Sequence, residues 1–253
     1  MKTVLKALLV VCMIAVSSPA FANDFANGGF ETGDLSGWTG GGGAWYGGGY
    51  PVSPVTYNGG PANNTIMNSG TTDPITGQNT VYNGNHSVRV NDSYNDYSVS
   101  TLRQSVLGYS DNNIYFQWNA VLEASHGTTD SDYFSLSLRD DTTGLDLVTR
   151  SYSSANTPAS FTQFANWYGS GWQLEQIDLT TAGVGGTSIV GDDFTLSLLA
   201  SDCPYGGHAG YVYLDGFAPV IVPPTNGVPE PATMLLLGLG LVGVAGLRRR
   251  FTK

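Results

Sequence analysis

Between residues 24 and 227 the chain has no lysine, and only four arginines stand against 19 acidic residues. This part therefore carries a formal net charge of −15, compared with −10 for all 253 residues. A body of this charge repels nucleic acid and anionic lipid, so neither is an expected partner. The sequence leaves open whether the acidity serves ordinary solubility outside the cell or a calcium site.

Cysteine is also scarce. Cys12 lies in an apolar N-terminal segment, and Cys203 is the only other cysteine. A single thiol cannot form an internal disulfide, so a packed core, with or without a metal ion, has to stabilise the fold. His208 is the only nearby group that could activate Cys203, and we expect a free, inert thiol there.

Catalytic signatures are missing as well. His86, His126 and His208 have none of the short spacings typical of metal ligands, and no Gly-x-Ser-x-Gly motif occurs. Neighbouring acids could supply the carboxylate pair of a glycoside hydrolase. On turns such pairs more often face solvent or bind calcium. The acids concerned are Asp130 with Asp132, Asp140 with Asp141, and Asp192 with Asp193.

Outside the two ends, no segment has a sustained helical period. Residues 133–139 instead alternate at period two, with Phe134, Leu136 and Leu138 on one face. Similar short segments separated by turns predict an all-β fold, an antiparallel β-sandwich of jelly-roll type, in one domain over residues 23–218. A long loop is expected at 58–80, and strands at 86–90, 97–106, 113–122, 133–139, 145–150, 172–179, 194–200 and 210–217.

Both ends of the chain carry targeting features. Lys2 and Lys6 precede an apolar stretch, and Ala20-Phe21-Ala22 is a small-x-small cleavage site, so residues 1–22 read as a signal peptide. Residues 219–228 read as a proline-rich linker. Residues 232–247 are uncharged and lie just below the usual length of a membrane span, so we expect a single C-terminal transmembrane helix within 229–253.

The C-terminal tail resembles a known sorting signal. Pro229-Glu230-Pro231, the apolar stretch and the basic tail Arg248-Arg249-Arg250 follow one another at the C-terminus. This order resembles the PEP-CTERM signal of Gram-negative bacteria that make exopolysaccharide. The resemblance implies transient insertion in the inner membrane, cutting near Pro-Glu-Pro by an exosortase-type membrane protease, and delivery to the cell surface or extracellular matrix. The alternative is an ordinary anchor that is never cut.

The body resembles a second family. Asn27-Gly28-Gly29-Phe30-Glu31, then residues 102–106 and the closing residues 211–217 resemble the galactose-binding-like jelly roll found in many carbohydrate-binding modules. That resemblance implies a structural Ca²⁺ near the first and last strands. Glu31 and Asp215 would supply carboxylates, and backbone carbonyls near Gly28 and Asn85 would complete the shell. The alternative is that both acids are turn residues.

Aromatic residues in glycine-rich segments are candidate sugar contacts. Trp45, Tyr46 and Tyr50 form one group, and Trp167 with Tyr168 forms another. Their rings could stack on sugar rings, or they could simply pack the loops onto the sandwich. We expect a non-catalytic structural or adhesive protein that binds extracellular polysaccharide. The alternative is a secreted glycan-active hydrolase.

Overall fold

The computed structural model describes residues 24–46, 60–128, 130–206, 208–218, 220–221 and 223–224. The expected signal peptide and C-terminal helix lie outside these residues, and so does the sorting tail. Within the described residues, no helix has the length and apolarity that a membrane crossing requires.

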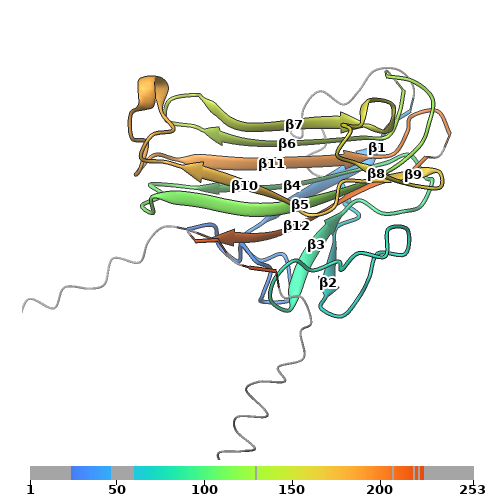
Figure 1. Ribbon diagram of the computed structural model, residues 1–253, viewed down its shortest axis with the longest axis horizontal. Coiled ribbons are helices and arrows are strands. Elements are labelled where there is room, and N and C mark those ends of the chain that lie inside the picture. Colours follow the sequence, from blue (N-terminus) through green and yellow to red (C-terminus); the bar gives the residue numbers. More distant parts are fainter. Residues whose placement is uncertain are drawn as a thin grey trace, which may run out of the picture.

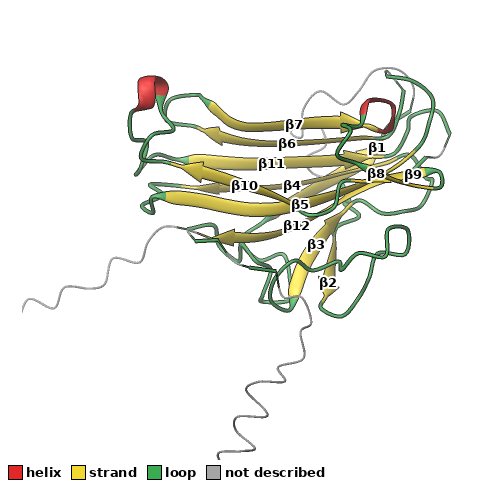
Figure 2. Cartoon of the chain, viewed as in Figure 1, coloured by secondary structure: helices red, strands yellow, loops and turns green. Residues whose placement is uncertain are grey.

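Two antiparallel sheets form the sandwich (Figures 1 and 2). The smaller sheet has the order β1-β4-β11-β6-β7, and the larger has the order β2-β3-β12-β5-β9-β8. β10 also pairs with β5, along the half that β9 leaves open. The strands are β1 (Thr39–Ala44), β2 (Thr65–Asn68), β3 (His86–Val90), β4 (Ser98–Val106), β5 (Asn113–Glu123), β6 (Tyr133–Asp140), β7 (Asp146–Ser153), β8 (Thr162–Phe164), β9 (Trp167–Gly169), β10 (Gln173–Asp178), β11 (Phe194–Ser201) and β12 (Gly210–Ala218). Short 3-10 helices occur at Ser154–Asn156 and Val184–Gly186.

Alternation along the strands builds the core between the sheets. On β6, Phe134, Leu136 and Leu138 are buried while the serines between them are partly exposed, which confirms the period-two prediction. Every second side chain of the neighbouring strand β11 and of β5 and β12 in the larger sheet fills the same layer. These residues include Phe116, Trp118 and Ala120 of β5, Leu196 and Leu198 of β11, and Val212 and Leu214 of β12.

The structure corrects the sequence prediction at short or glycine-rich strands. β1 has the sequence Thr-Gly-Gly-Gly-Gly-Ala, which shows no side-chain alternation, yet it pairs with β4 over its whole length. A Cβ at Gly42 would collide with the carbonyl oxygen of Pro61, so glycine allows residues 60–62 to lie against this edge. β2 lies within the expected loop 58–80, and β8 and β9 were not expected.

Candidate functional site

The opening motif lies directly against the closing strand. The backbone N–H of Phe217 donates to the carbonyl oxygen of Gly28 at 3.3 Å. A Cβ added at Gly28 would lie 2.6 Å from the Cβ of Phe217, so only glycine permits this approach. The contact brings Glu31 near Asp215, although 184 residues separate them in the sequence.

Asp215 is a fully buried carboxylate with one unsatisfied oxygen. Its Oδ2 accepts hydrogen bonds from the backbone N–H groups of Tyr82 (2.9 Å) and Asn83 (3.0 Å). Its Oδ1 is buried and has no hydrogen-bond partner. Burial raises the pKa of Asp215 to about 7; the backbone donors lower this pKa, and the nearby charge of Glu31 raises it. A cation bound at Oδ1 would give this buried oxygen a partner and stabilise the ionised carboxylate.

Glu31 is oriented by the start of β3. Its carboxylate accepts hydrogen bonds from the backbone N–H of Asn85 (2.9 Å), the Asn85 side-chain amide (3.1 Å) and the backbone N–H of His86 (3.1 Å). Asn85 therefore contributes donors to Glu31, a role that the resemblance does not imply. The carbonyls of Gly28 and Asn85 each accept one backbone N–H, from Phe217 and Ser69, and each retains a second lone pair.

Gln117 adds a residue that the sequence did not suggest. It lies opposite Asp215 in the β5–β12 register, and both polar atoms of its side-chain amide are buried without a partner. Carboxylate, amide and backbone oxygens are the ligands that Ca²⁺ takes. The donor set therefore fits calcium, with Glu31 and Asp215 as carboxylates and Gln117 as a further oxygen. Calcium binding itself stays a prediction.

The first aromatic group divides into a buried and an exposed ring. Trp45 is 6% exposed and packs on Val99 and Leu199, which fits the packing alternative. Tyr46 is 73% exposed, and its ring centroid lies 5.1 Å from that of Tyr97. Tyr50 lies outside the described residues. Of the two described members of this group, Tyr46 presents the face that a sugar ring could contact.

Trp167 and Tyr168 lie on the short strand β9, and both are half-buried. Trp167 packs against Tyr211, with ring centroids 6.1 Å apart. Asp73 accepts hydrogen bonds from the hydroxyls of Tyr211 (2.7 Å) and Tyr213 (2.8 Å). The segment that carries Asp73 therefore covers this outer part of the larger sheet, and Trp167 packs beside it.

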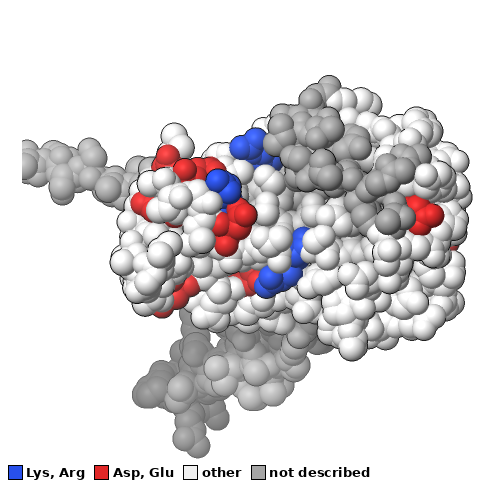
Figure 3. Space-filling model, turned by 90° about the horizontal axis from the view of Figure 1, so that it is seen from above, with Lys and Arg blue, Asp and Glu red and all other residues white. Residues whose placement is uncertain are grey.

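The outer face of the smaller sheet carries a row of polar side chains. Register neighbours across β1, β4, β11, β6 and β7 are Thr39, Arg103, Ser197, Ser137 and Thr149. A pocket of 380 Å³ opens beside this row, lined in part by Arg103 and Thr39. Hydroxyl and guanidinium groups can hydrogen-bond to sugar hydroxyls. Seen from above the view of Figure 1, the described surface is mostly uncharged; its acidic residues lie mainly toward one end, and its basic residues lie nearer the middle (Figure 3).

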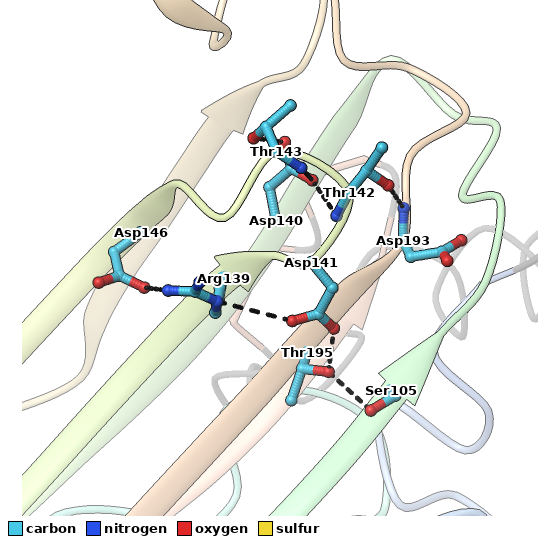
Figure 4. Close-up of polar contacts among 9 residues, drawn as sticks. All are labelled: Ser105, Arg139, Asp140, Asp141, Thr142, Thr143, Asp146, Asp193 and Thr195. Atoms are coloured by element: carbon cyan, nitrogen blue, oxygen red, sulfur yellow. Dashed lines mark hydrogen bonds and ion pairs between the residues drawn. The ribbon is translucent and has the colours of Figure 1, made fainter.

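Asp140 and Asp141 at the β6–β7 turn, and Asp193 just before β11, accept hydrogen bonds that stabilise turns and strand ends (Figure 4). Asp140 accepts the backbone N–H groups of Thr142 (2.9 Å) and Thr143 (3.1 Å). Asp141 accepts a hydrogen bond from the hydroxyl of Thr195 at 2.5 Å, and its Oδ1 lies 3.8 Å from Nε of Arg139. Asp193 accepts the backbone N–H of Gly108. These carboxylates are therefore engaged in local structure, which accounts for them without catalysis.

Replacing Trp45 and Tyr46 separately should distinguish packing from surface exposure. We expect Trp45→Ala to reduce the free energy of unfolding by about 3–5 kcal/mol, because it removes a buried aromatic ring. Tyr46→Ala should change it by about 0.5 kcal/mol or less, since that side chain is mostly in solvent. Urea unfolding of the two variants measures both values, and equal losses would contradict this division.

Comparison with known proteins agrees with the C-terminal interpretation. Residues 227–250 match the PEP-CTERM protein-sorting motif, so the chain carries this signal, which indicates an exported protein with a C-terminal membrane anchor. No curated protein sequence matches the chain.

Several solved structures are similar to the sandwich. One is TmCBM61, solved in complex with β-1,4-galactotriose: 12% identity, 77% of this chain and 95% of that chain covered, TM-score 0.40. Another is the non-crystalline cellulose specific carbohydrate-binding module CBM28: 14% identity, 79% and 98% covered, TM-score 0.39. A third is the enzymatically active domain of bacteriophage CBA120 tailspike protein 4: 13% identity, 78% and 22% covered, TM-score 0.35. Values this low transfer neither a ligand nor an activity to the chain.

Proposed function

We propose that the chain is a non-catalytic, polysaccharide-binding protein of the cell surface or extracellular matrix. An exosortase-type membrane protease cuts it near Pro229-Glu230-Pro231 after transient insertion in the inner membrane. The observation that carries this proposal is the sorting motif at residues 227–250, which follows the β-sandwich along the chain. The signal peptide predicted from residues 1–22 would direct the chain along the same route.

Two surfaces support polysaccharide binding. The exposed ring of Tyr46, beside Tyr97, offers an apolar face at one end of the sandwich. The polar row that includes Arg103 and Ser137 offers hydrogen-bonding groups on the outer face of the smaller sheet. Because residues 24–227 carry a net charge of −15, the favoured ligand is a neutral glycan.

The non-catalytic assignment is supported by how the acids are used. Among the described residues, Asp140, Asp141 and Asp193 accept hydrogen bonds from turns and neighbouring strands. A glycosidase needs one carboxylate free to protonate the leaving group and a second placed across the scissile bond. Carboxylates that already accept hydrogen bonds within turns are poorly placed to act as this catalytic pair.

Co-sedimentation with exopolysaccharide extracted from the producing cells tests this function. We expect binding by the purified chain, and about 2- to 12-fold weaker binding by Tyr46→Ala, since an aromatic contact contributes about 0.5–1.5 kcal/mol. Val184→Ala is the control, because it removes another exposed apolar side chain, 78% accessible, from a distant turn. Absence of binding would contradict the proposal. Release of new reducing ends would favour the hydrolase instead.

A further inference from the structure

Three metal-ligating side chains meet where β5 and β11 end. His126 follows β5, while Cys203 and His208 lie on the connection between β11 and β12. Their ligand atoms all lie within 4.8 Å of one another. The Sγ atom of Cys203 is 3.4 Å from Nδ1 of His126, and the two imidazole rings are 5.0 Å apart and almost perpendicular. None of the three belongs to the Glu31–Asp215 site.

These distances suit a tetrahedral zinc ion. Zinc binds thiolate sulfur at about 2.3 Å and imidazole nitrogen at about 2.0–2.1 Å, so neighbouring ligand atoms lie about 3.5 Å apart. The 3.4 Å between Cys203 Sγ and His126 Nδ1 matches that spacing. Nδ1 of His208 is buried and has no hydrogen-bond partner, so it is available as a ligand. Two imidazoles and one thiol are a soft to borderline donor set, which favours zinc over calcium.

Backbone contacts hold the two loops in place. The backbone N–H of Cys203 donates to the carbonyl of His208 at 2.8 Å. Glu123, at the end of β5, exchanges hydrogen bonds with Ala209: its own N–H donates to the Ala209 carbonyl, and its carboxylate accepts the Ala209 N–H. The ligands therefore sit on connections that are joined to each other without a metal ion.

Two acidic residues lie near the cluster. Oδ2 of Asp130 lies 3.8 Å from Nδ1 of His126. Asp132 is fully buried, and its Oδ2 has no hydrogen-bond partner. The carboxylate of Asp130, on the same loop as His126, favours a bound cation.

We propose that His126, Cys203 and His208 bind one zinc ion, with Asp130 or a water molecule in the fourth position. Zinc displaces the thiol proton to solvent and takes the thiolate as its ligand. The ion joins the β5–β6 and β11–β12 connections, in a body whose single cysteine cannot form an internal disulfide. The histidines have no metal-ligand spacing in the sequence, but the fold brings His126 and Cys203 together although they are 77 positions apart.

Metal titration of the purified full chain, without an affinity tag and stripped of metal, tests the site. We expect one equivalent of Zn²⁺ to bind, and Co²⁺ to give a thiolate-to-cobalt charge-transfer band that Zn²⁺ then removes. Excess Ca²⁺ should leave the band unchanged. His126→Gln and Cys203→Ser should each weaken zinc binding by more than about 100-fold, because even outer-shell partners contribute 10–100-fold. Thiolate bands should be absent in Cys203→Ser.

Thr128→Ala is the control, since it alters an exposed residue of the same loop and should bind zinc like the wild type. The His126→Gln variant also separates loss of metal binding from loss of folding. The His126 side chain is 41% exposed, so its replacement should leave the melting temperature of the metal-free protein unchanged. The proposal is overturned if cobalt binds without a thiolate band, or if His126→Gln binds zinc as tightly as the wild type. It is equally overturned if no stoichiometric zinc binds.

Discussion

Chelation of calcium should lower the melting temperature of the sandwich by about 5–10 °C. A ligand that binds only the folded state at a hundredfold excess over its Kd stabilises by about 2.7 kcal/mol. For a domain of this size, 1 kcal/mol corresponds to about 2–4 °C. Glu31, Asp215 and Gln117 lie on segments far apart in the sequence, so the ion would join the opening motif to β12 and β5.

We expect Asp215→Asn to be more stable than the wild type in chelator and less stable than the wild type with calcium. Without calcium, the wild type buries an unsatisfied carboxylate whose pKa is raised to about 7, chiefly by burial. A raised pKa in an acid means that stability is fully present below the unfolded value near 4 and is lost as the pH rises toward and through 7. Asparagine carries no charge, so above pH 7 in chelator the variant should be more stable than the wild type. With calcium, the wild type should be the more stable protein.

Calorimetry at pH 8, with calcium and with chelator, measures both effects. Glu31→Gln should also abolish the response to calcium, and combining it with Asp215→Asn should add little further loss of that response, since both residues serve one site. Thr180→Ala, an exposed turn variant, is the control and should keep the full calcium shift. Superimposable melting curves for the wild type in both conditions would remove the metal from this account and leave both acids as turn residues.

Deletion of residues 248–253 should prevent most of the chain from reaching the surface fraction. We expect Arg248, Arg249 and Arg250 to hold the end of the apolar stretch on the cytoplasmic side, because charged residues resist transfer across the bilayer. Without them the segment should lose its orientation before the protease can cut it. Immunoblots of inner-membrane, surface and extracellular fractions measure the outcome.

Replacement of all three arginines by lysine is the matched control for this deletion. Lysine keeps the positive charge, so this variant should still insert in the correct orientation. A defect in the lysine variant as large as in the deletion would indicate that the protease reads arginine itself. If the deleted chain reaches the surface as efficiently as the wild type, the tail has no role in sorting.

Side-chain alternation predicted the strands in which apolar and polar side chains alternate along the sequence. Strands such as β6 and β11 alternate serine or threonine with leucine, so their inner faces could be read directly. β1 could not be found because glycines 40–43 have no side chains to alternate. Its pairing depends on tertiary contacts with β4 and with residues 60–62, and β8 and β9 are too short for any period to show.

The candidate sites were predictable in part. The resemblance placed Glu31 and Asp215 at one site, and the structure brings them together through the contact between Gly28 and Phe217. Gln117 could not be foreseen, since its position depends on the β5–β12 register. Trp45 and Tyr46 were both candidate sugar contacts because they lie in a glycine-rich segment. Adjacent side chains of a strand point to opposite sides, and of these two Trp45 is buried while Tyr46 is exposed.

The mass of the chain recovered from the extracellular fraction tests most directly whether the sandwich works outside the cell, separated from its tail. We predict a chain that starts at Asn23 and ends near Pro229-Glu230-Pro231, so that residues 232–253 are absent. Intact-mass and terminal-peptide mass spectrometry of the protein from producing cells gives both ends. A chain that keeps its arginine tail and stays in the inner membrane would contradict the account.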